Sequence, residues 1–585
     1  MRMLLLIFSL TVAVIAAEMD APVLVNLGPK SNGVGTSWQI ALNACVGLAN
    51  LNSPSSVYSL GTSDMSLDYI WLSELDGFVP AKEDTSIFFK TCFADYAKGY
   101  VLYDYATQKA LIPNVLTYAA VAGAIPINKA VVDDFELGDM ELVQDLTHYP
   151  QRGGWRGMGA LEVTEKMWEE YKGDTTGLCM MNPGYQFNNG TDLHPPLNND
   201  PDPNLVDFIF SRRLFTMYLP NQCNPAFPRQ HAVMSTIATE NEWPKPIPVY
   251  GYDDTDPVLG GDMFEAETNC VEEGNMGQVA TKGVNNLAYW GGKVEEDGDL
   301  QLQQNDEKDL VYDPNKTYVA LVVGDGDNIN MLKGRNYVWW QARRRRCAEK
   351  GVADDLRCFP LVWTISSQLV ELHPRLLQYY YEGAKETGKD YFILPPSGSL
   401  YSYPSMMSDS VQEEYARTIV SDFAALDTRC SVHWEWFYSW GGEKGALATY
   451  FPRFSAVAGP GDALGFFLTN VPYPIPIEQF DSSEDFKIIA PSPDSRALVL
   501  FKPHVWRGTD TSNAERVLDP AYSSPARMAD KINGLPPGSV THIYLTSDGG
   551  ATIDSVYDLV VELGEEVMIV SAGQLVDIAL QKAGV

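Results

Sequence analysis

Short apolar and β-branched runs recur through the second half of the chain, and helical patterns lie between several of them. The clearest run covers residues 318–323, where apolar side chains follow one another without alternation. Such a run predicts a strand buried on both faces, as in a parallel sheet. Further runs lie at 359–364, 391–394, 431–437, 464–468, 497–501, 542–546 and 567–570, and helical patterns lie at 337–349, 374–387 and 411–426.

Eight strands with intervening helices predict a (β/α) barrel-like carboxy-terminal domain, closed or distorted. A doubly wound open sheet is the alternative, and residues 486–490 are a candidate for one more strand.

The first half alternates in a similar way, which predicts an α/β amino-terminal region. Strand patterns lie at 22–27, 99–104 and 125–127, and helical patterns lie at 115–124 and 207–219. From residue 291 to 313 the chain becomes polar and acidic, and we expect the main domain boundary there. The predicted organisation is a signal peptide at 1–17, an amino-terminal α/β region at 18–300, which could hold two subdomains, and a barrel-like catalytic domain at 301–585.

Charge and the first residues narrow the partners and the compartment. The chain has 585 residues and a formal net charge of −34, so its surface should repel nucleic acid and anionic lipid. Residues 3–17 form an apolar stretch that is too short to span a membrane and ends in small residues, which is typical of a secretory signal peptide. A retained anchor is the alternative. We expect a secreted or secretory-pathway protein with no membrane association after cleavage.

Cysteine usage agrees with export. All eight cysteines follow the predicted signal peptide and allow up to four disulfides, whose pairing cannot be deduced from spacing. None of them forms a CxxC pair, so we predict no cysteine-based metal site. Sequons at Asn189 and Asn315 are consistent with a glycoprotein.

Polar residues follow the predicted strands where each one ends. The strand at 318–323 is followed by Gly324, Asp325, Gly326, Asp327 and Asn328. The two glycines permit a tight turn that crowds the carboxylates. The carboxyl ends of parallel strands are where α/β folds place their chemistry. A solvated Asp/Gly/Asn turn without function is the alternative.

Carboxylates recur here beside aromatic side chains, which stack on sugar rings in carbohydrate-binding sites. The fourth run carries Trp434, Glu435 and Trp436, the sixth ends near His504, and the seventh ends at Asp548.

The stretch Gly398-Ser399-Leu400-Tyr401-Ser402-Tyr403-Pro404 resembles the motif that names the GxGYxYP family of putative glycoside hydrolases. The upstream Asp-Gly-Asp-Asn segment at 325–328 is similar to a segment of that family, and residues 99–104 resemble its amino-terminal domain. The resemblance implies a barrel-like carboxy-terminal domain and a carbohydrate substrate. Leu400 occupies the second glycine position, which changes the loop if that glycine serves a positive φ angle or a close backbone approach.

Hydrolysis of a glycoside requires one protonated and one ionised carboxyl group. We expect Asp325 or Asp327 to work with Glu435 as the general acid, because two tryptophans should raise the pKa of Glu435. Asp548 is a second candidate base or nucleophile. The alternative for Glu435 is an inward residue paired to an Arg or His.

The predicted substrate-binding residues are Asn328, Gly398, Tyr401, Tyr403, Trp434 and His504. Tyr401 and Tyr403 are two residues apart, so in an extended loop they would form an aromatic platform, or they could be core residues beneath it.

No cofactor is predicted, although Asp325 and Asp327 with His504 could hold a divalent cation in a metal-dependent carbohydrate deacetylase or phosphodiesterase. A non-catalytic glycan-binding protein is the further alternative.

Overall fold

The computed structural model describes residues 23–26, 32–60, 68–76, 85–135, 137–183, 204–219, 228–252, 275–281, 283–297, 300, 302–349, 354–436, 439–469, 484–509, 521–546 and 550–585, and the account is confined to them. The predicted signal peptide, Asn189 and Asp548 lie outside these residues. Among the described residues, no helix is both long and apolar enough to cross a membrane.

The described residues of the amino-terminal region form three parallel sheets. The pair β1 (Val23–Asn26) and β2 (Val57–Leu60) is packed against the long helix α2 (Asn32–Asn52). The second sheet has the order β4-β3-β5, built from Ile125–Asn128, Tyr100–Tyr103 and Leu142–Asp145. The third has the order β7-β6-β8-β9, built from Phe215–Met217, Leu178–Met181, Ile247–Tyr252 and Met276–Ala280. The predicted α/β layering is confirmed.

One predicted helix in this region is wrong in its second half. The helical pattern at 207–219 divides into α8 (Val206–Arg212) and strand β7. Arg213 adopts a left-handed φ of 54°, which ends the helix, and Phe215, Thr216 and Met217 then pair with β6. A short apolar run cannot be assigned to strand or helix by periodicity alone.

Further helices connect the strands of the amino-terminal region. They are α3 (Asp68–Asp76), α4 (Thr85–Asp95), α5 (Tyr105–Gln108), α6 (Ile112–Ala122), α7 (Ala160–Tyr171), α9 (Pro228–Glu240) and α11 (Leu287–Asp297).

The carboxy-terminal region carries two further sheets. The larger has the order β12-β11-β10-β18-β17, with β19 also paired to β10, and these strands are Asp390–Ile393, Leu361–Thr364, Thr317–Val323, Val540–Leu545, Pro503–Trp506 and Val567–Ile569. The smaller has the order β13-β14-β16-β15, from Cys430–His433, Leu464–Leu468, Leu498–Phe501 and Phe486–Ile489. Every pairing is parallel except that of the edge strand β15.

All predicted strands of this half are present, together with the candidate strand at 486–490. The hydrogen bonds divide them between two sheets, which meet through an isolated parallel bridge between Leu394 and Ser431. The α/β class with parallel sheets is confirmed, whereas the barrel-like arrangement, closed or distorted, is not confirmed.

The central strand β10 is buried on both faces, as predicted. Val319, Leu321 and Val323 belong to the main hydrophobic cluster. Tyr318, Ala320 and Val322 belong to a second cluster, whose other face is the carboxy-terminal helix α22 (Ala572–Ala583).

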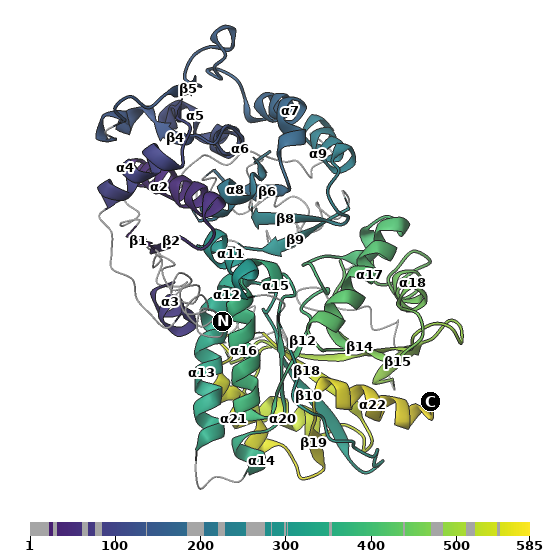
Figure 1. Ribbon diagram of the computed structural model, residues 1–585. Coiled ribbons are helices and arrows are strands. Elements are labelled where there is room, and N and C mark those ends of the chain that lie inside the picture. Colours follow the sequence, from purple (N-terminus) through teal and green to yellow (C-terminus); the bar gives the residue numbers. More distant parts are fainter. Residues whose placement is uncertain are drawn as a thin grey trace, which may run out of the picture.

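The outer helices of the carboxy-terminal region form the layer around these strands, on the lower half of the molecule in Figure 1. They are α12 (Ile329–Lys333), α13 (Arg335–Ala348), α14 (Asp354–Arg357), α15 (Leu369–Leu372), α16 (Pro374–Thr387), α17 (Asp409–Ala425), α18 (Tyr450–Ala458), α20 (Pro525–Asn533) and α21 (Ile553–Glu562).

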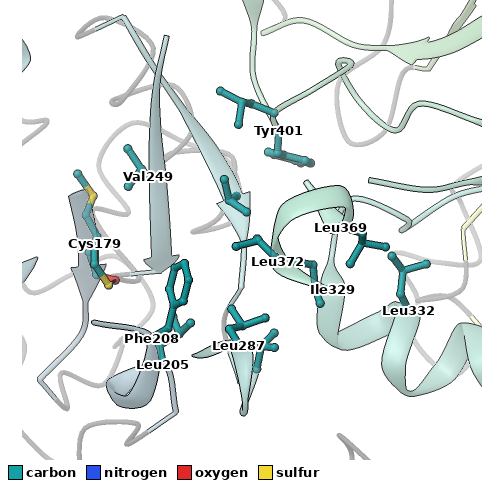
Figure 2. Packing of buried hydrophobic residues seen from close by; sticks show 14 of the residues in the cluster. Cys179, Leu205, Phe208, Val249, Leu287, Ile329, Leu332, Leu369, Leu372 and Tyr401 are labelled. Atoms are coloured by element: carbon teal, nitrogen blue, oxygen red, sulfur yellow. Dashed lines mark hydrogen bonds between the residues drawn. The ribbon is translucent and has the colours of Figure 1, made fainter. Parts of the chain in front are cut away.

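The two regions share one continuous core. Figure 2 shows it passing from Val249 and Phe208 of the amino-terminal region through Leu287 to Leu372 and Ile329 of the carboxy-terminal region. In Figure 1, β8 and β9 lie along the border between the two regions. The carboxyl ends of the sheet around β10 therefore meet the amino-terminal region.

Within the described part of the chain two disulfides are formed, Cys45–Cys92 and Cys347–Cys358. Cys179 and Cys430 are buried, and Cys223 and Cys270 lie outside the described residues.

Candidate active site

The turn after β10 is built around a close approach of two backbones. A Cβ atom on Gly326 would lie 1.8 Å from the carbonyl oxygen of Thr364, so only glycine fits there. The N–H of Gly326 donates to the Thr364 hydroxyl at 2.9 Å, and this hydroxyl donates to the carbonyl of Val323 at 2.9 Å. The turn is thus fixed to the end of the neighbouring strand β11.

Asp325 and Asp327 stand on either side of this glycine, and both are partly accessible. Asp325 has a φ of 63°, a left-handed conformation that Asp tolerates better than most residues. Burial, and secondly the charge of Asp325, raise the pKa of Asp327 to about 7. Asp327 can therefore hold a proton near neutral pH, which a general acid requires.

Asn328, predicted to bind substrate, forms the N-cap of α12. Its side-chain oxygen accepts hydrogen bonds from the N–H groups of Asn330 at 3.0 Å and Met331 at 3.3 Å. This capping fixes the direction in which the chain leaves the turn.

Glu435 occupies a separate and closed environment. Its side chain is 0% exposed, and it accepts hydrogen bonds from the Ser405 N–H at 3.0 Å, the Ser405 hydroxyl at 2.7 Å and the Ser439 hydroxyl at 3.0 Å. Nε2 of His433 lies 3.1 Å from Oε1, the same carboxylate oxygen that accepts from the Ser405 N–H. This arrangement matches the alternative in which Glu435 points inward and pairs with a histidine. Glu435 is also not among the groups that raise the pKa of Asp327, whereas Asp325 is.

The three aromatic residues predicted to bind sugar form a cluster in the interior. Tyr403 is 0% exposed, and Tyr401 and Trp434 are also buried. The Trp434 ring lies 4.6 Å from that of Tyr401 and 5.4 Å from that of Tyr403. Gly398, with a φ of 101°, packs against Ile419. Of the two alternatives for Tyr401 and Tyr403, an aromatic platform or core residues, the structure agrees with core residues.

His504 lies away from the turn. It stands opposite Ile543 of β18, which in turn stands opposite Leu321 of β10. It is therefore two strands, about 10 Å, across the sheet from β10, in line with the middle of that strand. Burial lowers the pKa of His504 to about 4, helped by Lys531, so the ring is neutral at pH 7. A cation site joining Asp325, Asp327 and His504 is not supported by this register. Among the described residues, no group of three or more His, Cys, Asp or Glu side chains is arranged to hold a metal ion.

Sequence reasoning missed Asp422 of α17. Its carboxylate accepts hydrogen bonds from Ser367, at 2.7 Å, and from Ser399, so it joins the loops that follow β11 and β12. Burial raises its pKa, against the lowering effect of both serines. Nothing in a helical pattern distinguishes this aspartate from the solvated acids around it.

Sequence reasoning also missed Asn330, in the first turn of α12. Its side-chain oxygen is buried and has no hydrogen-bond partner among the described residues. Its amide nitrogen would lie 3.2 Å from a Cβ on Gly283, in the loop after β9. An amide three residues after Asp327 therefore faces the amino-terminal region.

Comparisons with known proteins give one family and one structure. Residues 315–436 match the family model GxGYxYP putative glycoside hydrolase C-terminal domain, a range that includes Asp325, Asp327 and the motif at 398–404. No curated protein matches the chain. The crystal structure of a putative hydrolase from Bacteroides thetaiotaomicron is similar, with a TM-score of 0.66 and 17% identity over 97% of this chain and 95% of that one. At this identity the likeness concerns the fold.

Proposed function

We propose that this chain is a secreted enzyme that cleaves a poly- or oligosaccharide with Asp327 as the general acid. Asp327 lies in the part of the chain that matches the glycoside hydrolase family model. The observation that carries the proposal is the pKa of about 7 at Asp327, at the carboxyl end of a buried central strand. A glycosidic oxygen leaves only when it is protonated, and a carboxyl group with this pKa still holds its proton at neutral pH.

Asp325 supplies the complementary charge in this mechanism. Its negative charge raises the pKa of Asp327, which favours the protonated form of Asp327. In the proposed mechanism Asp327 keeps the proton, and Asp325 stabilises the positive charge that develops on the sugar ring or activates water.

Glu435 has a structural role in this proposal. Its carboxylate already accepts three hydrogen bonds from serines and contacts His433, so the protein itself occupies its oxygens. Through these bonds it joins Ser405, directly after the motif at 398–404, to Ser439.

The test is turnover of a panel of 4-nitrophenyl glycosides and reduced oligosaccharides across pH. We expect kcat/KM to fall as pH rises through about 7, because Asp327 then loses its proton. Asp327→Asn should lower kcat by about 10²- to 10⁴-fold, the usual contribution of a general acid.

Glu435→Gln is the matched control, since it also converts a carboxyl group to an amide in the same region. It should lose far less activity than Asp327→Asn. Equal loss in both variants, or full activity in Asp327→Asn, would remove Asp327 from the mechanism. Saturable glycan binding without cleavage by the wild-type protein would indicate a binding protein instead.

A further inference from the structure

The motif loop joins the two regions of the molecule through its backbone. Tyr401 and Gln278 of β9 form an antiparallel bridge, in which each N–H donates to the other carbonyl, at 2.9 and 3.0 Å. Nearby, the Ser408 N–H donates to the side chain of Asn275 at 2.7 Å. We call residues 397–404 the docking loop, because they extend the amino-terminal sheet at its β9 edge.

Side chains reinforce this contact in a complementary way. A Cβ on Gly277 would lie 2.7 Å from Cδ1 and 2.9 Å from Cβ of Leu400, so the leucine occupies the space that a side chain at 277 would need. Leu400 is buried and does not adopt a positive φ angle. The leucine at the second glycine position of the motif is therefore accommodated by a glycine in the other region.

The carboxy-terminal region holds the docking loop rigidly on its other side. The Tyr415 hydroxyl of α17 accepts from the Leu400 N–H at 2.9 Å and from the Ser402 hydroxyl at 3.1 Å. The Ser397 hydroxyl donates to the Trp434 carbonyl at 2.8 Å and accepts from the Trp434 N–H at 2.9 Å. A shift of the loop would therefore be passed on to β9.

What this contact positions lies at the other end of β9. Gly283 follows that strand by three residues and faces Asn330, whose amide is three residues from Asp327. The buried side-chain oxygen of Asn330 lacks a hydrogen-bond partner among the described residues, at the place where the two regions meet.

We infer that Leu400 and Tyr401 are positioning residues, which set the amino-terminal region against the turn at 325–328 so that the substrate subsite is shared between the two regions. The inference rests on the proposed function for its catalytic meaning. Leu400 and Tyr401 act through β9 and contact no reacting atom. Their effect should therefore fall on KM more than on kcat, as expected when binding is lost equally from ground and transition states.

The experiment exchanges the two residues at the contact. Leu400→Gly removes the packing, and Gly277→Ala forces Leu400 aside, so each single variant should raise KM about threefold or more on the best 4-nitrophenyl glycoside, with kcat within about twofold. The double variant L400G/G277A restores a side chain on one side only, and its KM should return to within about twofold of the wild type. Leu559→Ala, in the core face of α21, is the control for lost stability and should leave KM unchanged.

Hydrogen exchange at the backbone N–H of Gln278, which donates to the Tyr401 carbonyl, reports on the contact without any measurement of turnover. Exchange should be faster in each single variant than in the wild type or Leu559→Ala, and protected again in the double variant. Unchanged exchange and KM in both single variants would overturn the inference, as would an equal rise of KM in Leu559→Ala. Absence of glycan cleavage in the wild type with the expected exchange pattern would refute the proposed function while leaving the positioning contact in place.

Discussion

Two acids near strand ends of the carboxy-terminal region have opposite surroundings. Asp327 follows β10, is partly accessible, and has its pKa raised to about 7 by burial and by Asp325. Glu435 follows β13, is fully buried, and receives three hydrogen bonds from serines as well as a contact with His433. A carboxylate surrounded by donors is a structural element, whereas one that is crowded by another acid is poised for proton transfer.

The difference teaches that sequence position and neighbouring tryptophans do not determine the role of an acid. Trp434 and Trp436 flank Glu435 in the chain, yet serines and a histidine contact its carboxylate. Consecutive residues at the end of a strand point in different directions, so flanking side chains need not surround the residue between them.

The largest effect on stability is expected at Glu435. Glu435→Ala leaves the partly buried Ser405 N–H without its acceptor and removes one acceptor from the Ser405 and Ser439 hydroxyls, so it should lower the free energy of unfolding by about 3 kcal/mol. Urea unfolding at pH 7 measures this change. Glu435→Gln keeps one acceptor oxygen and should cost clearly less. If both variants unfold like the wild type, the hydrogen bonds at Glu435 do not support the fold, and the comparison with Asp327 fails.

Asp327→Asn should show the opposite effect. Because the folded protein raises the pKa of Asp327 from 3.8 to about 7, the unfolded state releases this proton first as pH rises, and the fold loses stability between about pH 4 and pH 7. The asparagine variant lacks this loss, so above pH 7 it should be more stable than the wild type, by at most about 4 kcal/mol for three pKa units.

Thermal unfolding of Asp327→Asn and wild type at pH 4, 6 and 8 measures this difference. The gap should be near zero at pH 4 and largest at pH 8. A constant gap would mean that the pKa of Asp327 is not raised by folding.

The sequence predicted the framework well and the roles of single residues less well. The strand at 318–323 was predictable because six consecutive apolar residues leave no polar face. The division of 207–219 into helix and strand was not, because it depends on a left-handed residue at Arg213 and on pairing with the distant β6. Tertiary pairing of this kind has no local signal.

The candidate site was predicted in part. The crowding of Asp325 and Asp327 follows from glycines in the sequence, and Gly326 is needed for contact with Thr364. The burial of Tyr401 and Tyr403 could not be deduced, because their partners lie elsewhere in the chain: Tyr401 pairs with Gln278 of β9, and both rings contact Trp434. Asp422 was missed for the same reason, since its serine partners come from two other segments.

Asp325→Asn should have the smallest effect, because it changes only one of the two causes that distinguish Asp327 from Glu435. Asparagine tolerates the left-handed φ of 63°, so the turn should keep its shape while one negative charge is removed. Since that charge raises the pKa of Asp327, the fall of kcat/KM with rising pH should move to lower pH, by about one unit for a close pair. Burial, the larger cause, is unchanged, so the pKa of Asp327 should stay above that of an exposed aspartate. A pH profile of Asp325→Asn that coincides with the wild type would show that the two carboxylates do not interact, and burial alone would then have to account for the proton on Asp327.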